Sequence, residues 1–175
     1  MFKKIALVVV IVIVAVLAYA STKPGTIHVQ RAASIKAPPE KIFPLINDLR
    51  GWGAWSPYEK RDPAMKRAYS GAATGKGAVY EWDGNKNVGK GRMEITDTAP
   101  PSRIAIKLDF FEPFEAHNTA EFTMDGKGDS TSVTWAMYGP ANYISKLMGV
   151  FFNMDKMIGR DFEAGLANLK AISEK

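Results

Sequence analysis

The chain has 175 residues, of which 46% are apolar and 23% are charged, and this is enough material for one hydrophobic core of ordinary size. The sequence has no cysteine, which excludes disulfide frameworks, thiol nucleophiles and metals bound by cysteine. The net charge is +5, or +3 once Lys3 and Lys4 are set apart, and the other lysines are scattered among acidic residues. We therefore expect one globular domain and no nucleic-acid partner.

Residues 1–25 are predicted to form a membrane-directed segment and a short linker. Sixteen uncharged and almost wholly apolar residues run from Ile5 to Ala20, after Lys3 and Lys4. As a helix this run is about 24 Å long, slightly less than the roughly 30 Å of a bilayer's hydrocarbon core. Two interpretations remain open: an uncleaved anchor, or a signal peptide cleaved after the small-x-small pattern Ala18-Tyr19-Ala20.

We favour the anchor, because the apolar run is slightly longer than the usual signal core of about 7 to 15 residues. In both interpretations the two lysines before the run keep the amino end in the cytoplasm. We therefore expect a single-pass membrane protein held through residues 5–20. Its domain would lie outside the cytoplasm, on the periplasmic side if the cell is Gram-negative.

Residues 26–175 are predicted to form the domain, which begins with a strand and short helices. The run TIHVQRAASI from Thr26 to Ile35 is typical of a strand, and Pro38 and Pro39 suit the start of a helix. GWGAWSP ends that helix. A second short helical piece is expected in YEKRDPAMK, before the chain becomes extended near residues 67–70.

Five further strands follow, separated by turns rich in Gly, Pro, Asn and Asp: VYEWD, GRMEITD, RIAIKLDFF, HNTAEFTMD and TSVTWAMY. Apolar and polar residues alternate in several of them, so that Ile104, Ile106 and Leu108 share one face. This spacing predicts an antiparallel meander with one covered face.

Residues 84–91, GNKNVGKG, are one residue short of a phosphate-binding loop. Gly91 stands where such a loop has Ser or Thr for magnesium, and strand-like runs flank the stretch on both sides. We therefore predict a hairpin turn without nucleotide affinity.

The last segment, from about Tyr143 to Glu174, is predicted to be one long amphipathic helix. At 100° per residue, Phe151 and Phe162 fall on its apolar side, and Asp155 falls in the middle of that apolar stripe. A carboxylate there needs a partner, for which we expect Arg31. The role of Asp155 stays open between a structural ion pair, a polar anchor for a ligand and a general acid or base.

Three stretches resemble a known superfamily: RAASIKAPPEKIFPLINDLRGWGAWSP, the strand pair from Gly71 to Trp82, and NMDKMIGRDFEAGLANLK. Through them, residues 26–175 resemble the START-like, or SRPBCC, superfamily, especially its polyketide cyclase/dehydrase and lipid-transport group. The resemblance implies an α+β helix-grip fold, in which a curved antiparallel sheet wraps around a long carboxy-terminal helix. It implies no particular activity, because the superfamily includes enzymes, carriers and proteins of other roles.

That fold implies an apolar cavity between the sheet and the last helix. The predicted ligand-binding residues are side chains in phase with the inward faces, joined by Trp55 near the expected opening and by the polar Asn118 and Asp155. They are Trp55, Tyr80, Trp82, Met93, Ile106, Leu108, Phe110, Asn118, Phe122, Trp135, Met137, Phe151, Met154, Asp155, Ile158 and Phe162.

The functional prediction is a membrane-anchored binding protein for a lipid-like or other apolar small molecule, with no catalytic residue, cofactor or metal assigned. His28 and His117 lack partners at metal-ligand spacing, and His117 shares the outward face of its strand with Thr119. Two alternatives remain open. One is a cyclase- or dehydratase-like enzyme, for which Asp155 with Arg31 is the only candidate pair, and the other is a non-catalytic interaction or stress protein.

Overall fold

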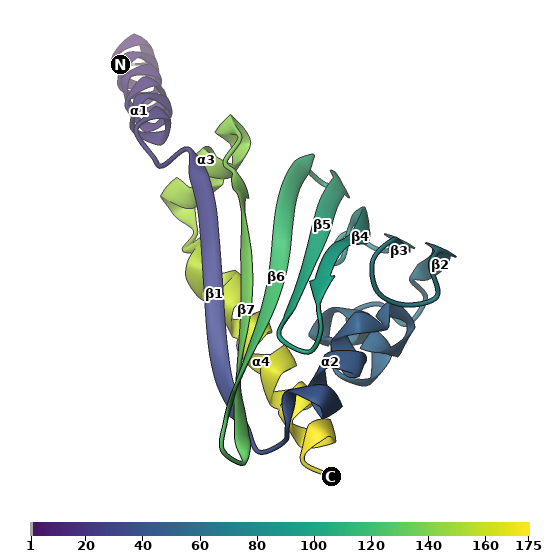
Figure 1. Cartoon of the computed structure of the whole chain (residues 1–175). Helices are drawn as coiled ribbons and strands as arrows, with labels where there is room; N and C mark the ends of the chain where they lie inside the picture. Colours follow the sequence, from purple (N-terminus) through teal and green to yellow (C-terminus); the bar gives the residue numbers. More distant parts are fainter. Residues whose placement is uncertain (1) are drawn as a thin grey trace.

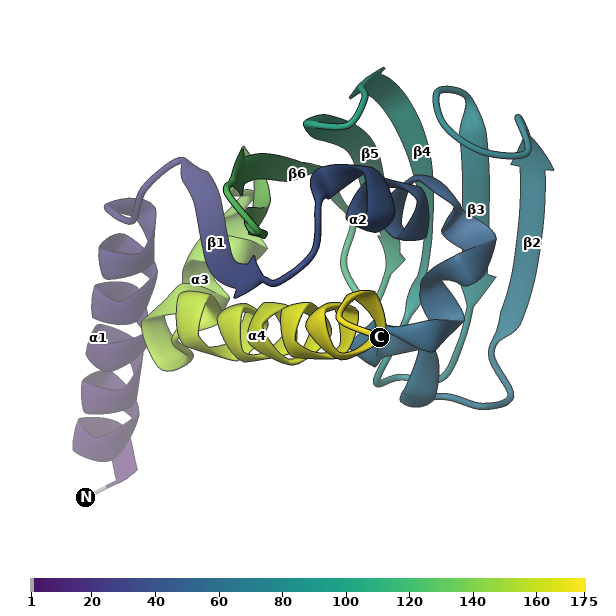
Figure 2. The ribbon, with the colours of Figure 1, turned by 60° about the horizontal axis from the view of Figure 1, so that its bottom comes forward.

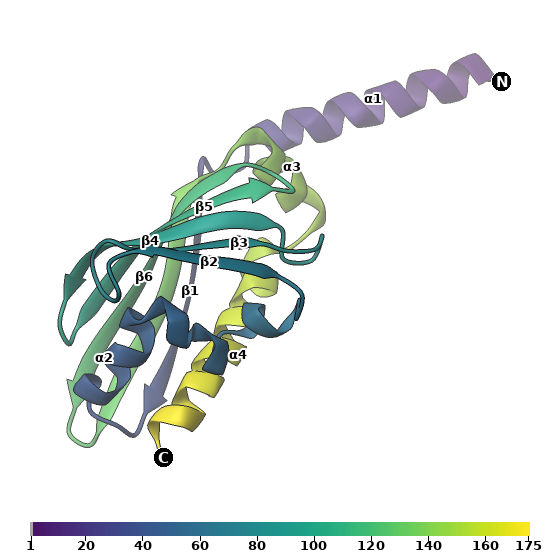
Figure 3. The same cartoon turned by 90° about the vertical axis from the view of Figure 1, so that its right-hand side faces the viewer.

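The computed structural model describes residues 2–175 and begins with helix α1, Phe2–Ser21. This helix projects away from the rest of the chain (Figure 3), and its residues are almost all exposed. Its length and mean hydropathy of 2.6 are those of a membrane span, and a signal sequence near the amino terminus has the same properties. The choice between anchor and cleaved signal therefore stays a prediction.

The domain is built on one seven-stranded antiparallel sheet with the order β1-β7-β6-β5-β4-β3-β2 (Figure 1). The strands are β1 Thr26–Ile35, β2 Lys66–Gly71, β3 Ala78–Asp83, β4 Lys90–Ala99, β5 Arg103–Glu112, β6 Ala116–Lys127 and β7 Ser130–Pro140. The predicted meander is confirmed for β2 to β7, and β1 closes it by pairing with β7. Buried and partly exposed residues alternate along most of β6 and β7, so that one face of the sheet is covered.

Helix α4, Met154–Ser173, crosses the covered, concave side of the sheet (Figure 2). Helix α2, Pro39–Asn47, lies beside the last turns of α4, and two short 3-10 helices follow it: η1, Leu49–Ala54, and η2, Pro57–Lys60. The short helical piece expected in YEKRDPAMK is confirmed only at its start, where η2 covers Tyr58 to Lys60. An irregular turn follows, since Pro57 suits a helix start and Pro63 prevents continuation.

The last segment is not one helix, contrary to the sequence prediction. Helix α3, Tyr143–Phe151, ends before α4 begins, and Phe152 between them has an extended backbone. The side chain of Asn153 caps α4 by accepting a hydrogen bond from the backbone N–H of Lys156 at 2.8 Å. An asparagine that satisfies a free N–H in this way favours a new helix start over an uninterrupted helix.

The GNKNVGKG stretch is a turn between β3 and β4, as predicted. Gly89 has a φ of +69°, and a side chain there would meet the carbonyl oxygen of Glu112, so the position requires glycine. Lys90 lies in β4 and pairs with Asp83 across the hairpin, with Nζ 3.3 Å from Oδ2. Gly89 and Lys90 therefore both have structural roles in this hairpin.

Aromatic rings fill the core where α4 meets the sheet. The indole of Trp135 stacks on the ring of Phe162 with 4.1 Å between centroids, and it contacts the rings of Trp52, Trp55 and Phe122. A side chain at Gly165 would lie 2.7 Å from the Trp135 ring, so this glycine sets the distance between α4 and β7. The packing fixes α4 on the sheet along its carboxy-terminal half.

Candidate ligand cavity

A cavity of about 550 Å³ lies between the concave face of the sheet and the amino-terminal half of α4. The aromatic cluster closes it at one end, where Trp52 and Trp135 form part of its floor. At the other end the lining includes the exposed residues Lys86 and Asn87 of the β3–β4 turn, Pro113 after β5, and Met157 of α4. The cavity therefore opens at the end of the sheet where β5 ends and β4 begins.

Most of the predicted ligand-binding residues line this cavity, because they alternate along strands whose inward face covers it. The residues in its wall are Tyr80, Trp82, Met93, Ile106, Leu108, Phe110, Asn118, Trp135, Met137, Met154, Ile158 and Phe162. Their position is a property of the fold. Their contact with a ligand remains a prediction.

Trp55 and Phe122 were expected in the cavity wall but lie outside it. Both side chains are fully buried in the core. Phe122 has the inward phase of β6, but at its depth the aromatic cluster already fills the space, and the rings of Trp55 and Phe122 meet edge to face. The alternation along a strand predicts which face of the sheet a side chain lies on. It does not predict at which position along the strand the packing leaves a void.

Phe151 and Asp155 were also placed in the cavity by a helical wheel that began at Phe151. The wheel fails because Phe151 belongs to α3 and Asp155 to α4, with the break between them. Phe151 is 65% exposed. The side chain of Asp155 is 59% exposed and lies in the first turn of α4. The prediction that this carboxylate lies within an apolar stripe is therefore wrong.

The predicted pairing of Asp155 with Arg31 is confirmed. Nη1 and Nη2 of Arg31 each donate to one carboxylate oxygen of Asp155 at 3.0 Å, and Nε donates to Glu163 at 2.8 Å. The hydrogen bonds from Arg31 lower the pKa of Asp155. Arg31 lies against the backbone of α4 at Gly159, where a Cβ would meet its guanidinium. The cluster ties β1 to α4 at the protein surface, and solvent screening makes its contribution to stability small.

A buried acid that the sequence did not single out lies in the cavity wall. Glu59 of η2 has a side chain only 9% exposed, and both of its oxygens are engaged. The hydroxyl of Tyr80 donates to Oε1 at 2.6 Å and Nε of Arg67 donates to Oε2 at 2.7 Å. Burial, followed by the hydrogen bond to Glu59, raises the pKa of Tyr80, so this hydroxyl stays protonated and keeps donating.

Asn118 is a buried polar residue of the wall whose side-chain oxygen has no hydrogen-bond partner among residues 2–175. The residue is 7% exposed, and its Oδ1 is buried without a partner in the described chain. A buried amide without partners costs free energy, which a ligand with a hydrogen-bonding group would recover. Asn118 is therefore the one predicted polar contact that the structure places in the wall.

An ion pair stands at the rim of the cavity between η2 and α4. Nη2 of Arg61 donates to Oδ1 of Asp161, and the Arg61 guanidinium lies 5.1 Å from the centre of the Tyr58 ring. Burial and the nearby charge of Asp161 raise the pKa of Tyr58. Tyr58 and Arg61 come from the irregular segment around η2, which has no periodicity, so no spacing in the sequence connected them with Asp161 of α4.

His117 lies on the convex face of the sheet, as predicted. Its Nδ1 is 2.7 Å from Oδ1 of Asp109, and its Nε2 is 3.2 Å from Oε1 of Glu115. The hydrogen bond with Asp109 raises the pKa of His117. Burial of Asp109 opposes its ionisation, but contacts with Lys107 and His117 lower its pKa overall. In residues 2–175, no cluster of three or more His, Asp or Glu side chains is suited to hold a metal.

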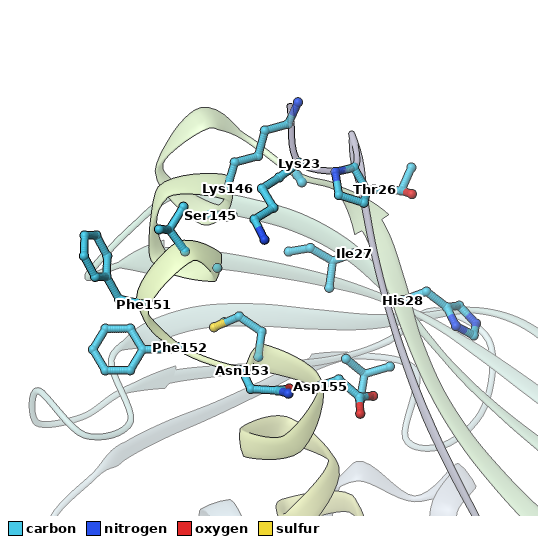
Figure 4. Close-up of a pocket in the computed structure, with 16 residues that line it drawn as sticks. Lys23, Thr26, Ile27, His28, Ser145, Lys146, Phe151, Phe152, Asn153 and Asp155 are labelled. Carbon is cyan, nitrogen blue, oxygen red and sulfur yellow. The ribbon is translucent and has the colours of Figure 1, made fainter. Parts of the chain in front are cut away.

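A second hollow, the β1–α3 groove, lies where α1 joins the domain (Figure 4). It has a volume of about 450 Å³ and lies between the first residues of β1, helix α3 and the start of α4. Lys23 and Lys146 contribute cationic groups to its wall, and Phe151 and Phe152 contribute aromatic rings. Ile27 and Met154 line both this groove and the cavity, so the two hollows are neighbours.

A curved antiparallel sheet gripping a carboxy-terminal helix around an apolar cavity defines an α+β helix-grip protein. Residues 26–174 match the family described as polyketide cyclase / dehydrase and lipid transport, and the chain belongs to this family. A comparison with curated proteins gives no match.

Solved structures show the same fold at low sequence identity. Ginseng major latex-like protein 151 from Panax ginseng is 13% identical, with a TM-score of 0.62 over 87% of this chain and 100% of its own. Protein CV1439 from Chromobacterium violaceum is 16% identical, with a TM-score of 0.59 over 87% and 99%. The Aha1 protein of Colwellia psychrerythraea, solved as a dimer, is 17% identical, with a TM-score of 0.56 over 85% and 96%. At these identities the likeness extends to the fold alone.

Proposed function

We propose that the protein binds a lipid-like or other apolar small molecule in the cavity while α1 holds it at a membrane. The observation that carries the proposal is the cavity: about 550 Å³, walled mainly by aromatic, aliphatic and methionine side chains with a few polar groups. This is the usual make-up of a small-molecule site. Protein interiors are otherwise packed densely, so a void of this size needs an explanation.

Family and fold support apolar ligand binding in general. The polar groups of the wall narrow the ligand class further. Asn118 offers an unpaired amide, whereas Glu59 is already satisfied by Tyr80 and Arg67. The ligand that fits is a mainly apolar molecule with a single hydrogen-bonding group near Asn118.

The structure supports binding better than catalysis, because a cyclase or dehydratase needs a free acid or base beside the cavity. Asp155, the acid expected from the sequence, lies in the β1–α3 groove and is paired with Arg31. Glu59 and Asp161 line the cavity, but protein donors engage both. Each would have to lose a partner before it could transfer a proton.

Native mass spectrometry of the full chain, purified in mild detergent from its own host, tests the proposal directly. We expect a bound apolar molecule that organic solvent extracts. In a second assay, N-phenyl-1-naphthylamine should accept excitation energy from Trp52, Trp82 and Trp135, which all line the cavity. A protein that carries no molecule and binds no probe would instead match the non-catalytic interaction alternative.

Two matched variants locate the probe. Ala120→Phe fills the cavity, because Ala120 lies in its wall, whereas Ala32→Phe makes the same change at an exposed position of β1. We expect the first to weaken probe binding about tenfold or more, which is about 1.4 kcal/mol, and the second to leave it unchanged. Equal effects would place the probe elsewhere.

A further inference from the structure

The strand directions bring α1, α3 and the cavity mouth to one end of the domain. Strand β1 begins next to α1, and its partner β7 ends beside it, with the N–H of Ala141 donating to the carbonyl oxygen of Gly25 at 2.9 Å. Because the sheet is antiparallel, β6 and β4 begin at this end and β5 and β3 finish there. The two turns at the mouth, 84–89 and 113–115, therefore lie on the same side as α1 and α3 (Figure 1). We call this side the open end.

Exposed large apolar side chains outside α1 gather at the open end. They include Phe111, Phe114, Tyr143, Ile144, Phe151 and Phe152. Scattered exposed apolar residues are ordinary on a protein surface, but a concentration at one end marks a surface that meets a partner.

Helix α3 is the centre of this surface. Its sequence YISKLMGVF carries one charge, Lys146, and none of its residues is buried. An apolar helix with no buried residue is not explained by packing within its own domain. The helix instead contacts α1, and the hydroxyl of Tyr143 donates to the carbonyl oxygen of Leu17 at 3.0 Å.

The link between α1 and the domain is short, so α3 must lie close to any membrane that α1 crosses. Only residues 22–25 separate α1 from β1, and four residues span at most about 14 Å. Ala20, in the last turn of α1, is already fully buried. If α1 crosses a bilayer, α3 therefore lies in the interfacial region, where amphipathic and aromatic side chains are stabilised.

The charges at the open end suit phospholipid headgroups. Lys23 and Lys146 line the β1–α3 groove beside Phe151 and Phe152 (Figure 4). The acidic residue of the same groove, Asp155, is paired with Arg31, which also donates to Glu163. Lysines beside exposed aromatic rings match a surface with anionic groups above acyl chains.

We propose that α3 and Phe152, with Phe114 of the β5–β6 turn, dock on the lipid bilayer and hold the cavity mouth against it. Lys23 and Lys146 contact anionic headgroups, and the β1–α3 groove, which shares Ile27 and Met154 with the cavity, lies between membrane and cavity. An apolar ligand then passes between the bilayer and the cavity without crossing water. This inference rests on the proposed membrane anchor and cavity function.

The absence of natural cysteine permits a direct test with the full chain in vesicles of phosphatidylcholine and phosphatidylglycerol. Single cysteines replace Ile144, Phe152 or, as a control in the turn at the opposite end, Asp129, and each carries an environment-sensitive fluorophore. We expect iodide to quench the labels at positions 144 and 152 several-fold less than the label at 129, and spin-labelled lipid to quench them more. Equal quenching at all three positions would overturn the docking surface.

A charged variant keeps the anchor but removes the docking residues. In Phe151→Asp/Phe152→Asp, the label at Ile144 should become accessible to iodide, and uptake of a pyrene-labelled lipid from the vesicle should slow several-fold. Unchanged uptake would contradict the proposal. Binding of N-phenyl-1-naphthylamine in detergent micelles is measured in parallel. In the protein that keeps Phe151 and Phe152, absent probe binding with shielded labels refutes the cavity function, whereas intact probe binding with labels accessible to iodide refutes docking.

Discussion

The two ends of the helix-grip domain are built differently, although the same strands and the same helix supply both. At the closed end, Trp55, Leu166 and Leu169 are almost fully buried, and aromatic rings contact one another with no space between sheet and helix. At the open end, the strands and α4 are separated by the cavity, and the surrounding turns expose apolar side chains. The closed end supplies stability, and this allows the open end to keep a void.

The largest expected effect comes from the closed end. Trp55→Ala should lower the free energy of unfolding by about 3–5 kcal/mol, because it empties a fully buried position. It also removes the donor to the carbonyl oxygen of Leu45. Urea unfolding of the full chain in detergent, followed by circular dichroism, measures this. Met157→Ala at the rim is the control and should change stability little, so losses of similar size would break the comparison.

The next largest difference between the two ends is expected when a methyl group is added at a glycine in each of them. Gly165→Ala places a Cβ 2.7 Å from the Trp135 ring and should destabilise the protein by about 1–3 kcal/mol. Gly149→Ala in α3 meets no atom within 4 Å and should stabilise the protein by about 0.5–1 kcal/mol, since alanine favours helix. Thermal unfolding of both variants gives the comparison. A neutral Gly165→Ala would mean that α4 can shift away from the sheet.

A smaller effect is expected from the polar group in the open end. Asn118→Leu removes a buried oxygen without a partner and should raise the free energy of unfolding by about 1 kcal/mol in the ligand-free protein. The variant should still bind a purely apolar probe and should lose its preference for probes with a hydrogen-bonding group. A destabilised variant with unchanged preference would show that Asn118 has a structural role.

The smallest effect is a pH dependence on the convex face. The pKa of His117 is raised in the folded protein, chiefly by the hydrogen bond with Asp109. Its contribution to stability is therefore fully present below the unfolded value of about 6.5 and is lost as pH rises through the folded pKa. His117→Gln should flatten the decline in stability over this range. Probe binding should not follow this titration, because the histidine lies on the face away from the cavity.

The residues of the candidate site were predictable wherever one local pattern, such as the period of a strand, decides which way a side chain faces. The period of two in β3 to β7 identified most of the apolar wall, including Tyr80, Met93 and Met137. The break at Phe152 could have been found from Asn153, a strong helix N-cap, but a continuing apolar pattern concealed it. That one error misplaced both Phe151 and Asp155.

Contacts between distant, irregular segments were outside the reach of the sequence. Glu59 meets Tyr80 and Arg67, and Arg61 meets Asp161 of α4, which is far away along the chain. No spacing rule connects a residue in a 3-10 turn with a partner on another element. Apart from Asn118, whose strand phase placed it on the inward face, the polar part of the cavity wall was therefore visible only in three dimensions.

The sequence by itself determined the order of the strands along the chain, the inward face of most of them and the apolar character of α1, because these follow from local periodicity and composition. The tertiary structure decided which inward residues meet a void and which meet another ring. Trp135 and Phe122 have neighbouring inward positions, yet Trp135 lines the cavity and Phe122 does not. The difference depends on how far α4 lies from the sheet at each level. This distance is set where Gly165, which lacks a side chain, and the ring of Phe162 pack against Trp135.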